Sequence, residues 1–154
     1  MGDYVKDIRK YIGHRPLMIV GASVIVENER GEILMLVRSD NHCWDYPGGA
    51  TELDERVEDA AARELFEETG LHAKSLELFG VFSGPDTHYV YPNGDEVSVV
   101  DIVYRCRDYD GELIPQEGEA EELRFFAPAD VPENLSPPII PTMKKWFAEK
   151  GIHR

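Results

Sequence analysis

The chain has 154 residues and a formal net charge of −14 at pH 7, and 42% of its residues are hydrophobic and 30% charged. This composition is typical of a globular protein with a hydrophobic core, and it excludes a disordered chain. A surface this acidic repels phosphate backbones, so long DNA or RNA is not expected as a partner, whereas a small phosphorylated ligand screened by divalent cations is compatible with it.

The sequence also argues against membrane association and secretion. No apolar stretch is long enough to cross a bilayer, and the first twenty residues carry charges where a signal peptide would be apolar. The two cysteines, Cys43 and Cys106, lack metal-ligand spacing and are expected to be free thiols in a reducing compartment. A cytoplasmic location is therefore expected.

The first half of the chain alternates between apolar runs and turn residues. In chain order it predicts a helix over Asp3–Ile12, a hairpin with strands over Leu17–Val26 and Ile33–Val37, a Pro/Gly loop over Trp44–Gly49, and a helix from Glu55 to Thr69. Gly13 and Gly70 are expected to end the two helices.

The second half is richer in strands. It predicts a strand over Leu76–Phe82, a hairpin turn at Pro92–Asp95, a buried strand over Val97–Arg105, a short strand over Leu123–Ala127, and a final helix from Pro141 to Lys150. Helices interrupt the strands without a regular βαβ alternation. We therefore predict an α/β (α+β) fold, with a mixed β-sheet covered by helices on both faces, in a single domain spanning residues 1–154.

Three glutamates of the helix predicted over Glu55–Thr69 have an unusual position. At about 100° per residue, Glu64, Glu67 and Glu68 lie within an arc that overlaps the apolar stripe of the helix, so they are expected to lean toward the protein. Crowded carboxylates repel one another, and burial makes their ionisation costlier. A divalent cation such as Mg²⁺ or Mn²⁺, which prefers oxygen ligands, would relieve both costs. The alternative is a solvated acidic helix face.

The same segment resembles a known family motif. Gly49, Glu55 and the run Arg63-Glu64-Leu65-x-Glu67-Glu68-x-Gly70-Leu71 are spaced like the complete Nudix box, preceded by Trp44-x-x-Pro47-Gly48-Gly49. The chain therefore resembles Nudix (MutT-like) hydrolases, which implies an α/β/α sandwich with additional N- and C-terminal helices. One departure is Asp54, where many members of the family have Gly. Aspartate tolerates left-handed backbone and is able to cap a helix, so we expect little disturbance of the loop.

The resemblance also implies roles for individual residues. Glu64, Glu67 and Glu68 would hold Mg²⁺ or Mn²⁺, with the Gly48 backbone carbonyl and Glu52 as further ligands. Glu55 and Arg63 would hold the loop against the helix through charge-assisted hydrogen bonds. The general base that takes the proton from the attacking water would be Glu64 or an acid of the segment 117–122, among which Glu119 is favoured.

Residues that bind the substrate are harder to identify. Arg38, at the end of the second strand, is a candidate for a phosphate contact, and Tyr89 and Tyr91 are candidates for stacking on a base. The corresponding alternatives are an exposed arginine and ordinary packing of tyrosines. In the family, a Pro some residues beyond the box indicates ADP-sugars as substrates, and a Tyr there indicates dinucleoside polyphosphates. This chain has Pro85 and Tyr89 near these positions, so the hint does not discriminate between the two substrate classes.

These residues imply an enzyme that cleaves the pyrophosphate bond of a nucleoside diphosphate linked to a group X, giving a nucleoside monophosphate and phospho-X. ADP-ribose and similar nucleotide sugars are the first expectation. Nucleoside triphosphates or dinucleoside polyphosphates are the alternative, and capped or triphosphorylated RNA ends come third. A Nudix-shaped binding module without catalysis is a further alternative, although this chain has every acid of the box. Both a monomer and a homodimer fit the sequence.

Overall fold

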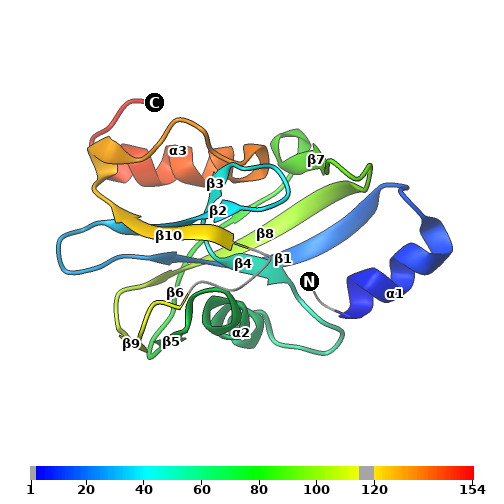
Figure 1. Ribbon diagram of the computed structural model, residues 1–154, viewed down its shortest axis with the longest axis horizontal. Helices are drawn as coiled ribbons and strands as arrows, with labels where there is room; N and C mark the ends of the chain where they lie inside the picture. Colours follow the sequence, from blue (N-terminus) through cyan, green and yellow to red (C-terminus); the bar gives the residue numbers. More distant parts are fainter. Residues whose placement is uncertain (1–2, 115–119) are drawn as a thin grey trace.

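The computed structural model describes residues 3–114 and 120–154 (Figure 1). In chain order the helices and strands are α1 (Asp3–Ile12), β1 (Leu17–Val26), β2 (Ile33–Arg38), β3 (Trp44–Asp45), β4 (Gly48–Ala50), α2 (Val57–Thr69), β5 (Leu71–Ala73), β6 (Glu77–Phe82), β7 (His88–Val90), β8 (Glu96–Cys106), β9 (Tyr109–Gly111), β10 (Ala120–Phe126) and α3 (Ile140–Glu149). Short 3₁₀ helices, η1 (Pro85–Thr87), η2 (Pro128–Asp130) and η3 (Pro137–Ile139), join some of them.

The longest strands, β1 and β8, form the centre of the larger sheet. They run parallel, with pairs from Leu17–Val97 to Val26–Cys106. The strand order is β4-β1-β8-β6, and β7 also pairs with β8. The β4, β6 and β7 pairings are antiparallel, so the sheet is mixed, as predicted. A second sheet has the order β10-β2-β3, and β5 pairs with β9 separately.

The predicted hairpin of β1 and β2 is wrong as a paired unit. The turn forms, because the Gly31 N–H donates to the Asn28 carbonyl at 2.9 Å, but a single bridge between Glu27 and Ile33 connects the two strands. Beyond it, β8 and β4 occupy the two edges of β1, so β2 pairs with β10 and β3 in the other sheet. The segment predicted as a loop at residues 44–49 also differs, since it contains the short strands β3 and β4.

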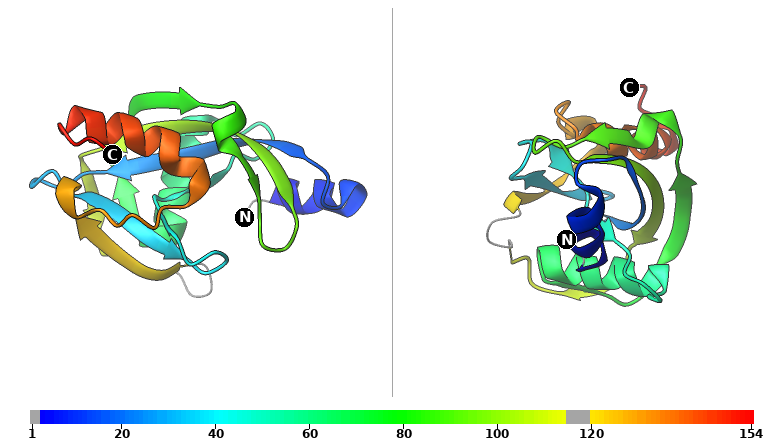
Figure 2. Two further views of the ribbon diagram at one scale, coloured as in Figure 1. Left: turned by 90° about the horizontal axis from the view of Figure 1, so that it is seen from above. Right: turned by 90° about the vertical axis from the view of Figure 1, so that its right-hand side faces the viewer.

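Alternation along β1 places helices on both faces. Val24 and Val26 are buried in a cluster with Ala61 and Leu65 of α2. Ile25 points the other way, into a cluster with Trp146 of α3. Figure 2 shows α2 and α3 on opposite sides of the strands, so the predicted covering of both faces is confirmed. In the part of the chain that the structure describes, every helix is too short or too polar to cross a membrane.

The start and the end of α2 are set by local backbone geometry. The helix begins after Arg56, and Asp54 takes a left-handed φ of 63° in the preceding loop, so Asp54 tolerates this backbone but does not cap the helix. Gly70 ends the helix with a φ of 82°, as predicted, and donates its N–H to the Phe66 carbonyl. A Cβ at position 70 would lie 2.5 Å from the Glu112 carbonyl oxygen, so only glycine fits this end of the helix.

Candidate active site

A cavity of about 480 Å³ lies where β4 and α2 meet the ends of several other strands. Its volume is within the range of roughly 300–1,000 Å³ that small-molecule sites occupy. The walls come from α1, β1, the ends of β2 and β8, the β3–β4 segment, α2, the β7–β8 turn and η3. Residues that are far apart in the sequence therefore converge on one space.

Glu64 and Glu68 of α2 line this cavity, but Glu67 does not. Glu64 is 3% exposed, whereas the Glu67 side chain is 45% exposed. The expectation that all three glutamates lean inward is therefore correct for two of them and wrong for Glu67, which lies at the edge of the arc. Glu68 Oε1 accepts a hydrogen bond from the Gly48 N–H at 2.7 Å, which joins α2 to β4.

Only glycine fits at position 49, because the Glu64 carboxyl group lies directly beside its backbone. A Cβ on Gly49 would lie 2.5 Å from Glu64 Oε1, closer than any real contact of a Cβ atom. A Cβ on Gly48 would likewise lie 2.9 Å from the Ser23 Cα. The two glycines thus allow β4 to pass between the carboxyl group on α2 and the neighbouring strand β1.

Arg63 connects the loop to the acids of α2. Its Nε and Nη2 donate to the two carboxylate oxygens of Glu55 at 2.8 and 2.9 Å, and its Nη1 lies 3.0 Å from Glu64 Oε1 and 3.3 Å from Glu67 Oε2. Hydrogen bonds from the guanidinium hold the pKa of Glu55 below its usual value. Glu55 Oε1 also accepts from the Glu52 N–H at 3.0 Å. Arg63 thus fixes the orientation of the Glu64 carboxylate.

Burial makes the inward acids difficult to ionise. It raises the pKa of Glu64, although the nearby Arg63 charge opposes the rise, and it raises the pKa of Glu68 well above its usual value. The Gly48 N–H only partly offsets the burial of Glu68. Carboxyl groups with raised pKa values in a cavity are typical of functional sites.

Two further buried acids line the cavity, and neither was predicted from the sequence. Asp45 of β3 is buried, which raises its pKa to about 7 even though Arg38 lies nearby. Asp101 of β8 accepts hydrogen bonds from Ser23 Oγ and Tyr46 Oη, both at 2.7 Å, and burial raises its pKa as well. The signal for Asp101 was present in the sequence, because it interrupts the apolar run from Val99 to Val103.

The predicted substrate contacts all line the same cavity. Arg38 donates to both carboxylate oxygens of Asp40, at 2.8 and 2.6 Å, and lies 3.4 Å from Asp45. Its guanidinium carbon is 5.7 Å from the centre of the Tyr91 ring. Tyr89 and Tyr91 pack edge to face, with ring centres 5.0 Å apart. The structure thus brings these three side chains together at the cavity.

Glu52 does not join this group. Glu52 is absent from the cavity wall, and its Oε1 accepts a hydrogen bond from the Tyr4 N–H of α1 at 3.1 Å. Its expected role as a metal ligand stays a prediction, and in this structure its carboxylate contacts α1 rather than the cavity. Glu119, the favoured loop base, and Glu117 lie outside the described residues. The neighbouring Glu121 pairs with His42 at 2.8 Å.

Within residues 3–114 and 120–154, no group of three or more His, Cys, Asp or Glu side chains is gathered around a single point as a metal site would require. The carboxylates of Glu64 and Glu67 instead form salt bridges with Arg63, and that of Glu68 accepts a hydrogen bond from the Gly48 N–H. The chemistry of the donors nevertheless fits a hard divalent cation, because all are carboxylate oxygens and two have pKa values raised by burial.

Comparisons with known proteins show which family the chain belongs to. The NUDIX domain family model matches residues 18–149. The chain is 34% identical over 132 residues to the ADP-ribose pyrophosphatase of Methanocaldococcus jannaschii, covering 83% of this chain and 72% of that protein. It is 32% identical over 121 residues to a MutT-like protein of Streptomyces ambofaciens, covering 79% and 71% of the two chains. A solved structure of a MutT NUDIX hydrolase from Burkholderia pseudomallei has a TM-score of 0.66 and 31% identity, over 78% of this chain and 91% of that chain.

The mixed sheet, the helices on its two faces and the complete box define a hydrolase of the Nudix type. The chain belongs to the NUDIX family and is one of its pyrophosphohydrolases. Family members generally act with divalent metal ions, and small nucleotide-derived substrates fit them. The family membership and the fold predicted from the sequence are therefore confirmed.

Proposed function

We propose that this enzyme cleaves the pyrophosphate bond of a nucleoside diphosphate linked to a group X, with ADP-ribose or a similar nucleotide sugar as the substrate, and releases a nucleoside monophosphate and phospho-X. The observation that carries the proposal is the placement of Glu64 and Glu68 beside the Gly48–Gly49 backbone in a cavity that also contains Arg38 and a pair of tyrosines. The similarity to a protein named ADP-ribose pyrophosphatase supports the choice of substrate.

The side chains of this cavity have separate tasks in the reaction. Arg38 attracts the diphosphate, and the Tyr89–Tyr91 pair offers a surface on which a base stacks, an interaction of roughly 1–3 kcal/mol when the geometry is good. Arg63 keeps the Glu64 carboxylate in one orientation. A water oxygen attacks phosphorus, the bridging P–O bond breaks, and a carboxylate, either Glu64 or Glu119, takes the proton from the water.

Mg²⁺ or Mn²⁺, held by Glu64, Glu67, Glu68 and the Gly48 carbonyl, would lower the pKa of the attacking water and neutralise the pyrophosphate. The carboxylates of the cavity would otherwise repel the substrate's own negative charge. Burial raises the pKa values of Glu64 and Glu68, so ionising them costs free energy in the absence of a cation. A bound cation would offset this cost.

Product analysis with a panel of substrates tests the proposal. ADP-ribose, nucleoside triphosphates and diadenosine polyphosphates are incubated with the protein and Mg²⁺ or Mn²⁺, and the products are identified by chromatography. We expect ADP-ribose to give AMP and ribose 5-phosphate with the highest kcat/KM. A higher kcat/KM for triphosphates or dinucleoside polyphosphates would instead support the alternative substrate class.

A pair of variants on the same helix tests the role of the acids. Glu68→Gln is expected to lower kcat by roughly 100-fold or more while the protein stays folded, because it removes one carboxylate that would hold the cation and so weakens stabilisation of the transition state. Glu58→Gln, an exposed residue of α2, is the matched control and is expected to keep wild-type turnover. Near-wild-type turnover in Glu68→Gln would refute this mechanism. Nucleotide binding by calorimetry, without hydrolysis of any substrate by the wild-type protein, would favour a non-catalytic binding module.

A further inference from the structure

The helix α1 lies outside the part of the chain that matches the family and nevertheless forms part of the cavity wall. The family match begins at residue 18, whereas α1 ends at Ile12. Val5 and Arg9 of α1 line the cavity, and Val5 is only 5% exposed. Figures 1 and 2 show α1 and α3 toward opposite ends of the molecule.

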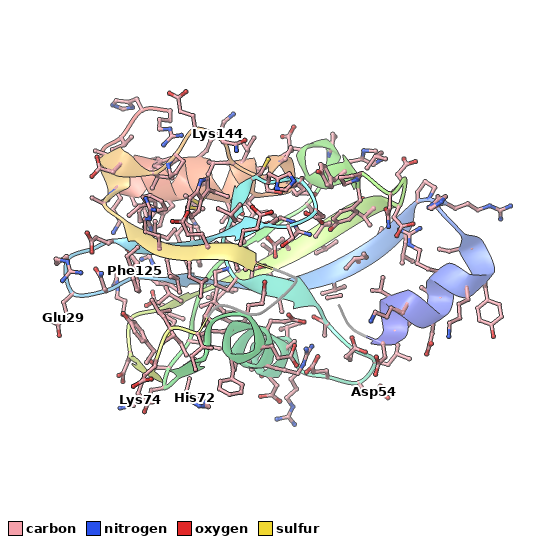
Figure 3. All side chains as sticks on the ribbon, viewed as in Figure 1. Glu29, Asp54, His72, Lys74, Phe125 and Lys144 are labelled. Atoms are coloured by element: carbon pink, nitrogen blue, oxygen red, sulfur yellow. The ribbon has the colours of Figure 1, made fainter. Side chains whose placement is uncertain are left out.

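The first turn of α1 is held by the loop that precedes α2. The Tyr4 N–H, one of the helix's first N–H groups, donates to Glu52 Oε1 at 3.1 Å. The backbone of Glu52 donates in turn to Glu55, which pairs with Arg63. Figure 3 shows the neighbouring Asp54 on the side of the molecule where α1 lies. The start of α1 is thus connected through hydrogen bonds to the residues that orient Glu64.

The last turn of α1 is held by the turn between β7 and β8. Arg9 donates to the carbonyl oxygens of Gly13 and Arg15, at 2.9 and 2.6 Å, and to that of Glu96 at 2.7 Å. The ring of His14 lies 2.7 Å from Asp95, and the Glu96 N–H donates to the His14 carbonyl. This turn follows Tyr91 directly. The start of α1 therefore contacts the loop before α2, and its end contacts the turn next to the Tyr89–Tyr91 pair.

We propose that α1 is a specificity-determining wall of the active site, which restricts the group X to compact groups such as a pentose and disfavours an extended group such as a second nucleoside. This inference rests on the proposed function. Val5 is the apolar side chain that α1 contributes to this wall, so its size affects the space left for the group X. Arg9 is a positioning residue, since its hydrogen bonds fix α1 against β8. The selectivity follows from the size of the space beside α1. A difference of one methylene between two substrates changes the ratio of their kcat/KM values by roughly 10- to 200-fold.

The test measures one ratio, the kcat/KM for diadenosine tetraphosphate divided by that for ADP-ribose. Val5→Ala enlarges the cavity and is expected to raise the ratio about tenfold, whereas Val5→Leu fills it and is expected to lower the ratio. Arg9→Ala releases the end of α1 and is expected to raise the ratio. A loss of stability alone would reduce both activities together and leave the ratio unchanged.

Arg154→Ala is the matched control. Arg154 also donates to two backbone carbonyls, those of Val131 and Pro132, but it is not part of the cavity wall. We expect it to keep the wild-type ratio. If Val5→Ala, Val5→Leu and Arg9→Ala all keep the wild-type ratio while ADP-ribose is still hydrolysed, the inference is wrong and the proposed function stands. If the wild-type protein hydrolyses neither substrate, the proposed function fails and this inference fails with it.

Discussion

Asp45 is a buried acid whose ionisation costs stability, so Asp45→Asn is expected to stabilise the protein at neutral and alkaline pH. Burial raises its pKa from 3.8 to about 7, and the neighbouring Asp101 adds to the rise. The folded protein therefore binds more protons than the unfolded chain between these two values, and stability falls as the pH rises through them. The full cost, reached above pH 7, corresponds to about 4 kcal/mol.

The gain on substitution does not exceed this cost. The pKa of about 7 already includes the attraction of Arg38, so the ion pair that Asp45→Asn would no longer form adds no further cost, and Arg38 keeps its two hydrogen bonds to Asp40. We expect Asp45→Asn to gain about 2–4 kcal/mol at pH 8 and nearly nothing at pH 4, where the carboxyl group is protonated in the folded protein and half-protonated in the unfolded chain.

Urea unfolding of the metal-free protein in EDTA, at several pH values from 4 to 8, measures this gain. The free energy of unfolding of Asp45→Asn minus that of the wild type should increase with pH. Asp86→Asn, at an exposed position, is the control and should show no such trend. A difference that stays constant with pH, or a variant less stable than the wild type at pH 8, would refute the reasoning.

Three other substitutions follow from close contacts. Gly49→Ala is expected to lower kcat roughly 100-fold, because its Cβ would displace the Glu64 carboxylate; unchanged ADP-ribose hydrolysis would contradict this. Gly70→Ala is expected to destabilise the fold by about 1–3 kcal/mol in urea unfolding, because φ is 82° and a carbonyl oxygen lies at 2.5 Å. Glu27→Gln is expected to cost about 3–5 kcal/mol, because Glu27 is buried and accepts from Lys150 at 2.6 Å; a loss below about 1 kcal/mol would count against a stabilising pair.

The sequence predicted the local elements better than their pairing. The bounds of β1 and α1 were predicted to the residue, because an apolar run and a helical spacing are local signals. The partner of β1 was not predictable in the same way. Both faces of β1 are buried, so its pattern does not alternate over most of its length, and nothing nearby in the sequence marks β8 as its neighbour. The hairpin with β2 was the local alternative, and it was wrong.

The same limit applies to the candidate site. Helical spacing predicted that Glu64 and Glu68 face inward, because their positions relative to the apolar stripe are fixed by the period of the helix. Spacing alone did not show that Glu67 lies far enough around the helix to be exposed. Asp45 had no sequence signal, because the pattern at residues 44–49 predicts a loop, whereas burial in β3 raises the pKa of Asp45. The contact of Glu52 with α1 depends on tertiary structure and has no sequence signal.

From the charges of the cavity we expect an anionic ligand and a cation to bind together. Glu64, Glu68, Asp45 and Asp101 all have pKa values raised by burial, so each ionised carboxylate is already unfavourable before a phosphate arrives. Arg38 offers a positive charge but is largely engaged by Asp40 and Asp45. Ionised carboxylates of the cavity would repel a diphosphate that binds without a cation. A cation that binds without the nucleotide would lack the phosphate oxygens as ligands. Because linkage is reciprocal, whatever affinity the cation adds for the nucleotide, the nucleotide adds for the cation.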